Sequence, residues 1–278
     1  MLTPKTIPVP AGGHTQNLSI VEIGRGMPFL FLHGWGTNRS TFYPLMERLN
    51  SFGRLIALDF PGFGDSPPPP ETWGTGEYAE CLFALIASLG LPPCWAVAHS
   101  FGGRVALRLA HAHPEALQGL VLIASAGLRR KPPLRRRLRV SVIRSLARAA
   151  AYLPSPVGPS IHDALYRRIA SRDYLEAGDL RSTFVRVVNE DLSPLLPAIS
   201  LPVLLIYGSD DRETPPWIGR RFAELLPASE YVELPGFDHL SILDRGSHQV
   251  EHHVRRFLDR YMKNEIRQPQ NENEGKNA

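Results

Sequence analysis

One stretch of the sequence is the most informative about its architecture: Trp95-Ala96-Val97-Ala98-His99-Ser100-Phe101-Gly102-Gly103-Arg104-Val105-Ala106-Leu107-Arg108-Leu109-Ala110. Its first half is a short apolar run typical of a buried strand, and its second half has apolar residues at helical spacing. Ser100 lies between the two halves, with Ala98 two residues before it and Gly102 two residues after it. Small residues at both positions allow the strand and helix backbones to approach each other closely. The stretch therefore predicts a sharp strand-to-helix turn with a serine at its tip.

Two interpretations of Ser100 are open from this stretch alone. In the first, the serine is a nucleophile on a strand-to-helix elbow of the G-x-S-x-G type, with Ala98 in place of the first glycine. In the second, it is an ordinary helix N-cap, a position at which serine is favoured. The choice between them depends on the rest of the chain.

Apolar runs alternate with helical patterns on both sides of the elbow. Strands are predicted at residues 17–23, 28–32, 54–58, 95–98, 120–123, 202–207 and 230–234, and helices at residues 37–50, 78–89, 101–111, 217–226 and 248–262. Most of the strand runs are continuously apolar, as in strands that are covered on both faces. This alternation predicts the α/β class, with a mostly parallel sheet and helices on both of its faces.

The alternation is interrupted once, from about residue 127 to residue 196. This segment has helical patterns and proline-bearing joints but no buried-strand run. We predict an all-helical cap at residues 127–196, inserted into a core that is made of residues 1–126 and 197–263. The last residues, 264–278, are rich in Asn, Glu and Gln and are predicted to form a disordered polar tail.

Composition narrows the possible partners and compartments. The chain has 278 residues, 43% of them hydrophobic and 21% charged, and a modest net charge of +4. This balance gives no indication of nucleic-acid or membrane binding. Cys81 and Cys94 are predicted to be reduced thiols, and no zinc-type spacing of Cys and His is present. The first residues lack a signal-peptide core, and no apolar stretch is long enough to span a bilayer, so we expect a cytoplasmic protein.

A basic run lies in the predicted cap. It consists of Arg129-Arg130-Lys131, Arg135-Arg136-Arg137 and Arg139. A charge run of this kind is most often a solvated surface. The alternative is a docking surface for an anionic partner or substrate.

Four loops, at residues 33–36, 98–102, 208–215 and 235–240, each follow a predicted strand. Strand ends of a parallel sheet meet at one edge, where open α/β sheets bind their ligands. Ser100, an acid at 210 or 211, and His239 should therefore lie close together. A serine nucleophile needs a base such as imidazole, and the imidazole needs a carboxylate that fixes its tautomer.

The chain resembles the α/β-hydrolase superfamily from about residue 17 to residue 262. The resemblance is carried by His33-Gly34-Trp35-Gly36, Asp59-x-Pro-Gly-x-Gly-x-Ser66, Ala98-His99-Ser100-Phe101-Gly102-Gly103, and Gly208-x-x-Asp211-x-x-x-Pro215 with Gly236-x-x-His239. The chain departs from the family pattern at Ala98, where glycine is usual. The resemblance implies the α/β-hydrolase fold with an inserted helical cap.

The resemblance also implies roles for individual residues. Ser100 would be the nucleophile, His239 the general base and acid, and Asp211 the carboxylate that orients His239. Asp210 is a rival for the carboxylate role, whereas Asp238 is predicted to be a surface residue.

An oxyanion hole and a substrate pocket are implied next to these side chains. The oxyanion hole would be formed by the backbone N–H groups of Trp35 and Phe101. His33 is expected to hold its loop, and His99 to line the sheet or the pocket rather than transfer protons. No cofactor and no metal are implied. The residues expected to line the pocket are His33, Gly34, Trp35, Phe101, Phe237 and Leu240.

The function expected from these observations is hydrolysis of small-molecule carboxylic esters with mostly apolar acyl groups. One alternative is a carbon–carbon bond hydrolase of aromatic ring-fission products. Another is a methyl ester esterase that acts on pimeloyl carrier protein, an acidic partner that the basic run would complement. A third, from a different class, is a non-catalytic ligand receptor on a hydrolase scaffold. A haloalkane dehalogenase is disfavoured because its nucleophile is an aspartate at the position of Ser100.

Overall fold

The computed structural model describes residues 2–129, 134–150, 152, 157, 160, 161, 164, 165 and 171–267. Its strands are β1 (Lys5–Ala11), β2 (His14–Ile23), β3 (Pro28–Leu32), β4 (Arg54–Leu58), β5 (Cys94–His99), β6 (Leu117–Ile123), β7 (Val203–Gly208) and β8 (Ser229–Leu234). They form one eight-stranded sheet in the order β1-β2-β4-β3-β5-β6-β7-β8. Strand β2 pairs antiparallel with β1 and β4, and all pairs from β4 to β8 are parallel. The predicted mostly parallel sheet is confirmed.

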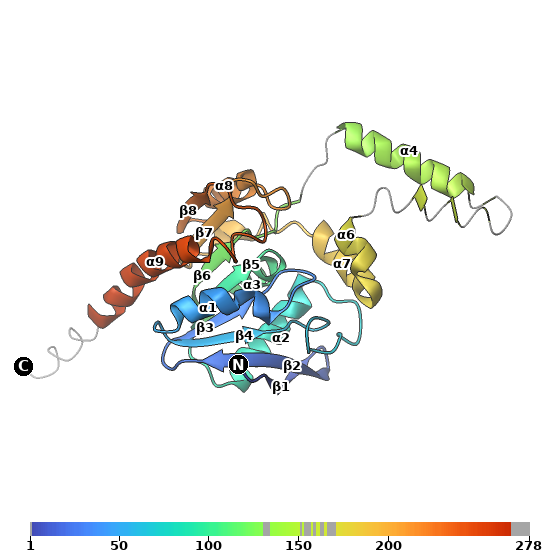
Figure 1. Cartoon of the computed structure of the whole chain (residues 1–278). Coiled ribbons are helices and arrows are strands. Elements are labelled where there is room, and N and C mark those ends of the chain that lie inside the picture. Colours follow the sequence, from blue (N-terminus) through green and yellow to red (C-terminus); the bar gives the residue numbers. More distant parts are fainter. Residues whose placement is uncertain are drawn as a thin grey trace, which may run out of the picture.

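Helices cover both faces of this sheet (Figure 1). One face is covered by α2 (Thr75–Ser88), α3 (Phe101–Ala112) and α8 (Pro216–Leu225), and the other by α1 (Tyr43–Leu49) and α9 (Ser247–Arg267). Strand β3 shows why the strands are continuously apolar. Its Leu30 and Leu32 pack in the cluster with α2 and α3, whereas Phe29 and Phe31 pack in the cluster with α1 and α9. Because successive side chains point to opposite faces, a strand covered on both sides needs apolar residues throughout.

Three elements differ from the sequence prediction. Strand β1 is not among the predicted strands; it contains Pro8 and Pro10, which are tolerated because it lies at the sheet edge. The helix predicted at residues 37–50 is split into a 3-10 turn, Arg39–Phe42, and α1. Helix α9 continues to Arg267, beyond residue 262, where the predicted helix ends, and its added residues include good helix formers. Residues 268–278 of the predicted polar tail lie outside the described residues.

The segment between β6 and β7 contains helices α4 (Leu134–Ala150), α6 (Arg172–Glu176) and α7 (Arg181–Asn189), and short 3-10 turns at Gly178–Leu180 and Leu196–Ala198. The described part of this segment contains no strand. Helix α4 stands apart from the sheet, while α6 and α7 lie nearer to it (Figure 1). The cap boundaries at 127 and 196 remain a prediction.

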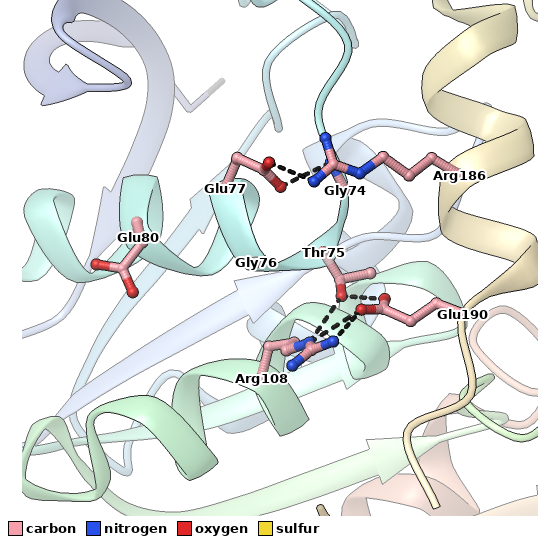
Figure 2. Close-up of a pocket in the computed structure, with 8 residues that line it drawn as sticks. All are labelled: Gly74, Thr75, Gly76, Glu77, Glu80, Arg108, Arg186 and Glu190. Atoms are coloured by element: carbon pink, nitrogen blue, oxygen red, sulfur yellow. Dashed lines mark hydrogen bonds and ion pairs between the residues drawn. The ribbon is translucent and has the colours of Figure 1, made fainter.

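Ion pairs fasten the end of this insertion to the core (Figure 2). Arg186 on α7 donates to the Glu77 carboxylate on α2 at 2.6 Å. The Glu190 carboxylate accepts hydrogen bonds from Arg108 on α3 and from the Thr75 hydroxyl. These side chains line a cavity of about 420 Å³. The C-terminal end of the insertion, from Arg186 to Glu190, is therefore held against α2 and α3.

Within the described part of the chain, no helix is both long and apolar enough to cross a lipid bilayer.

Candidate active site

Ser100 occupies the sharp turn between β5 and α3. Its backbone has φ 50° and ψ −108°, a conformation that L-residues rarely adopt. The Ser100 N–H donates to the carbonyl of Ile123 at 3.2 Å, and the Ser100 carbonyl accepts from Gly103 N–H at 3.1 Å and from Ala126 N–H at 3.2 Å. A strained residue persists only where its surroundings hold it in place. The geometry is that of the elbow, whereas an N-capping hydrogen bond from the Ser100 side chain is not found among the described residues.

The small neighbours of Ser100 have the physical role that the sequence suggested. A Cβ atom at Gly102 would overlap the carbonyl oxygen of Leu32, and the Gly102 N–H donates to the His33 carbonyl at 3.0 Å. Helix α3 thus starts directly against the end of β3. Ala98, the departure from the family pattern, is fully buried in the hydrophobic core, which accommodates its methyl group.

Three of the predicted side chains form a continuous hydrogen-bonded chain. The Ser100 hydroxyl lies 2.9 Å from Nε2 of His239, and Nδ1 of His239 lies 2.7 Å from Oδ2 of Asp211. His239 and Asp211 are buried, with 8% and 3% of their surfaces exposed. If Nδ1 carries the proton and donates it to Asp211, Nε2 has a free lone pair for the Ser100 hydroxyl. The structure therefore brings together residues from the loops after β5, β7 and β8.

Thr214 belongs to this group of side chains but is not predicted from the sequence. Its hydroxyl lies 2.8 Å from Oδ2 of Asp211 and 2.9 Å from the Ala124 carbonyl. Oδ1 of Asp211 accepts from the backbone N–H groups of Glu213 and Thr214, both at 2.8 Å. Burial alone would raise the pKa of the Asp211 carboxyl, but hydrogen bonds from His239 and Thr214 outweigh it and leave that pKa below its ordinary value. Asp211 is thus held ionised behind His239.

The other acids near His239 have different positions. Asp210 accepts a hydrogen bond from the Ser209 hydroxyl at 2.8 Å, and Asp238 accepts from N–H groups of its own loop. Glu213, which the sequence did not single out, has a carboxylate oxygen 3.5 Å from Nε2 of His239, and its side chain is 68% exposed. Asp211 is the acid on the Nδ1 side. Among the described residues, no group of three or more His, Cys, Asp and Glu is placed to hold a metal ion.

His33 holds its loop from inside the protein. Nε2 accepts from the Phe60 N–H at 3.0 Å, so Nδ1 carries the proton and donates to the Gly34 carbonyl at 2.7 Å. His33 is fully buried, its two ring nitrogens are both hydrogen-bonded, and its ring contacts Phe60 and Phe63. The expectation that its side chain lines the pocket is therefore not supported. Burial lowers the pKa of His33 to about 4.

This buried histidine should make the stability of the fold depend on pH. Its pKa in the folded state is below the ordinary value of about 6.5, so between about pH 6.5 and 4 the unfolded chain binds more protons than the folded one. The free energy of unfolding is therefore highest above pH 6.5 and falls as the pH decreases through this window. In His33→Gln, the free energy of unfolding, measured with urea, should depend less steeply on pH: its slope should be reduced by up to about 1.4 kcal/mol per pH unit. A matched His248→Gln variant, changed at an exposed position of α9, should keep the wild-type slope; equal slopes in wild type and His33→Gln would contradict the assignment.

An aromatic cluster adjoins Ser100 and extends to the insertion. The ring of Trp35 lies 4.9 Å from Phe63, 5.5 Å from Phe101 and 5.1 Å from Phe184 of α7, measured between centroids. A cavity of about 260 Å³ lies beside Trp35 and is also lined by Leu180, just before α7. In the described part of the chain, the N–H groups of Trp35 and Phe101 donate no hydrogen bond to a protein acceptor. Apolar surface and two unused backbone donors therefore occur together next to the serine.

The remaining predicted pocket residues are not part of this cluster. Phe237 packs with the residues under α1 and α9, on the other face of the sheet from Phe101. Leu240 is 54% exposed. Gly34 is buried, and a Cβ atom there would come within 3.4 Å of Cβ of Ser100. Of the six residues expected to line the pocket, Trp35, Phe101 and Gly34 lie next to Ser100.

Comparisons with known proteins agree with the α/β fold described above. A sequence model described as the alpha/beta hydrolase family matches residues 29–257. A pimeloyl-[acyl-carrier protein] methyl ester esterase from Shewanella woodyi is 30% identical over 229 residues, which make up 77% of this chain and 85% of that protein. A thermophilic esterase from Thermogutta terrifontis is 25% identical, with a TM-score of 0.69 over 93% of this chain and 98% of the other. A meta-cleavage product hydrolase from Pseudomonas fluorescens IP01 has a TM-score of 0.69 over 94% and 98% of the two chains, and at 19% identity this likeness concerns the fold alone.

Proposed function

The chain belongs to the alpha/beta hydrolase family, and from that premise we propose that it hydrolyses carboxylic esters of mostly apolar acids, with Ser100 as the nucleophile. The observation that carries the proposal is the hydrogen-bonded chain from Ser100 through His239 to Asp211. This arrangement activates a hydroxyl that is otherwise a weak nucleophile. The esterases among its relatives support the same reaction class.

The reaction proceeds in two halves. The Ser100 oxygen attacks the ester carbonyl while Nε2 of His239 accepts the hydroxyl proton. The tetrahedral oxyanion then collapses, and the alcohol leaves with the proton that His239 returns to it. In the second half, His239 takes a proton from a water molecule, which attacks the acyl-enzyme. The second tetrahedral intermediate then collapses, the acid leaves, and His239 returns the proton to the Ser100 oxygen. Asp211 holds His239 in the required tautomer and stabilises its positive charge in both halves.

The N–H groups of Trp35 and Phe101 are the proposed oxyanion donors. Trp35 follows Gly34, where a Cβ atom would lie 3.4 Å from Cβ of Ser100, and Phe101 begins α3 directly after Ser100. Donors placed where charge develops are typically worth about 3 kcal/mol of transition-state stabilisation each. The aromatic cluster of Trp35, Phe63 and Phe184 supplies apolar surface for the acyl group.

A panel of p-nitrophenyl esters of graded acyl length, assayed beside an aromatic ring-fission product, tests this function. We expect turnover of the esters and a higher kcat/KM for butyrate than for acetate. A higher kcat/KM for the ring-fission substrate would favour the carbon–carbon hydrolase alternative. The absence of both a burst and a steady-state rate with every substrate would favour the non-catalytic receptor.

A second candidate substrate is a methyl ester carried on an acidic carrier protein. The relative from Shewanella woodyi is named for such a substrate. In this chain, Arg135, Arg139, Arg144 and Arg148 are exposed on α4, and residues 116–162 contain no Asp or Glu. An acidic protein surface would complement this segment and be steered toward it.

Charge reversal on α4 tests whether this helix contributes to the hydrolysis of carrier-linked esters but not of free ones. The triple variant Arg135→Glu, Arg139→Glu and Arg144→Glu should lower kcat/KM at least tenfold for a carrier-linked methyl ester and change it less than twofold for p-nitrophenyl butyrate. The effect should weaken as salt is raised, because salt screens exposed charges. Arg256→Glu, on the exposed side of α9, is the matched control and should affect neither substrate. Equal losses on both substrates would count against a docking role for α4.

A further inference from the structure

His99, the residue immediately before Ser100, is a buried ionisable group that the proposed reaction does not use. It ends strand β5 and is 1% exposed. Its Nε2 lies 2.9 Å from the backbone carbonyl oxygen of His239. A carbonyl accepts hydrogen bonds and cannot donate them, so Nε2 carries the proton and donates it. The side chain before the nucleophile is thus bonded to the backbone of the base.

We propose that His99 is a positioning residue whose Nε2–H fixes the backbone of His239, and through it the imidazole, at hydrogen-bonding distance from Ser100. This inference rests on the proposed function, in which His239 transfers the protons. It adds a second connection between the nucleophile and the base, made through the backbone rather than through the reacting side chains.

The loop that carries His239 makes no backbone–backbone hydrogen bond to β5 among the described residues, and the bond from His99 is what joins the two. Its earlier part is tied to the loop of the acid instead: the Gly236 N–H donates to the Ser209 hydroxyl at 2.8 Å, and the Phe237 carbonyl accepts from the Asp210 N–H at 3.0 Å. The bond from His99 therefore ties the backbone of residue 239 directly to the end of β5. Because small displacements of a catalytic group are costly, this contact should matter for the rate.

The other side of the His99 ring is fixed by packing. Nδ1 has no hydrogen-bond partner among the residues that the structure describes, and a Cβ atom at Gly34 would lie 2.9 Å from it. The ring therefore fills the space between the loop of Trp35 and the loop of His239. Burial, with the nearby His239 as a smaller cause, lowers the pKa of His99 to about 3, so the ring stays neutral at physiological pH with Nε2 protonated. A buried acceptor without a partner is unfavourable for folding, which argues that the residue is not there for packing alone.

Two substitutions separate positioning from packing. In His99→Gln, the amide nitrogen replaces Nε2 and can still donate to the His239 carbonyl. In His99→Asn, the shorter side chain places its amide near the former Nδ1, facing Gly34, and leaves that carbonyl without its donor. We expect kcat per active site to fall about 10- to 100-fold in His99→Asn, with KM changed less than threefold, and to stay within about threefold of wild type in His99→Gln.

The active sites are counted by titration with a fluorophosphonate, so that unfolded protein does not contribute to kcat. A His99→Asn variant that loses titratable sites but keeps the wild-type kcat per site would overturn the proposal, because its role would then be structural. So would equal losses of kcat in the Gln and Asn variants.

A spectroscopic measurement decides the inference even if ester hydrolysis is not the function. The Nδ1 proton of His239, held on Asp211, should give a downfield proton resonance in wild type and His99→Gln. We expect this resonance to shift or broaden in His99→Asn, since the imidazole is no longer held in place. An unchanged resonance in His99→Asn would contradict positioning, whereas a wild-type protein with the resonance but no hydrolysis and no labelling of Ser100 would contradict the proposed function alone.

Discussion

Ser100→Ala is expected to lower kcat for p-nitrophenyl butyrate by about 10⁴- to 10⁶-fold, the range seen when the nucleophile of a serine hydrolase is removed. Among the described residues, the hydroxyl of Ser100 is the one hydrogen-bonded to Nε2 of His239, at 2.9 Å, and alanine removes it. Residual activity would come from the backbone donors and from substrate binding.

The same substitution should leave the fold intact. Alanine already adopts positive φ in this protein, at Ala124 with φ 46°, so the elbow accepts a methyl group in a similar conformation. The midpoint of thermal unfolding should stay within a few degrees of wild type. Ser145→Ala, on the exposed surface of α4, is the matched control and should keep full activity. Near-wild-type turnover by Ser100→Ala would remove this residue from the mechanism.

Asp211→Asn is expected to lower kcat by about 10⁴-fold, because the neutral amide favours the wrong tautomer of His239. Two backbone N–H groups, from Glu213 and Thr214, point at Oδ1 of Asp211 and would select the amide oxygen of Asn for that position. The amide NH₂ would then face Nδ1 of His239 and donate to it. The proton of the imidazole would move to Nε2, which could no longer accept from Ser100.

The adjacent acid provides the control for this prediction. Asp210→Asn changes the same residue type one position earlier, where the carboxylate bonds to Ser209 rather than to His239. It should retain kcat within about twofold. A large loss in Asp210→Asn together with a small loss in Asp211→Asn would show that the carboxylate role belongs to Asp210.

The parts of the fold that could be predicted from the sequence are those in which local pattern and tertiary burial agree. Strand β3 is apolar at every position because both faces of the sheet are covered, and the amino-acid pattern alone therefore indicates a buried strand. The elbow could be predicted for a similar reason, since Gly102 must be small to clear the Leu32 carbonyl. The order of Ser100, Asp211 and His239 along the chain, each after a strand, then places them at one edge of the sheet.

The parts that could not be predicted depend on contacts between distant segments. Strand β1 forms despite Pro8 and Pro10 because an edge strand tolerates missing donors on its outer side. Thr214 could not be singled out from the sequence, because a threonine near an acid is common. Its hydrogen bond to the Ala124 carbonyl forms only because β6 and β7 lie side by side in the folded sheet. Phe237 is close to His239 in sequence, which suggests a pocket residue, yet successive residues of a loop can face opposite sides of a sheet.

Stoichiometric labelling with a fluorophosphonate, followed by peptide mass mapping, tests whether Ser100 is an activated nucleophile. Such a reagent reacts with a serine whose hydroxyl is activated by a neighbouring base. We expect one label per chain, on Ser100, and none in Ser100→Ala. Labelling of a different residue in the wild-type protein, or no labelling of the folded enzyme, would contradict this expectation.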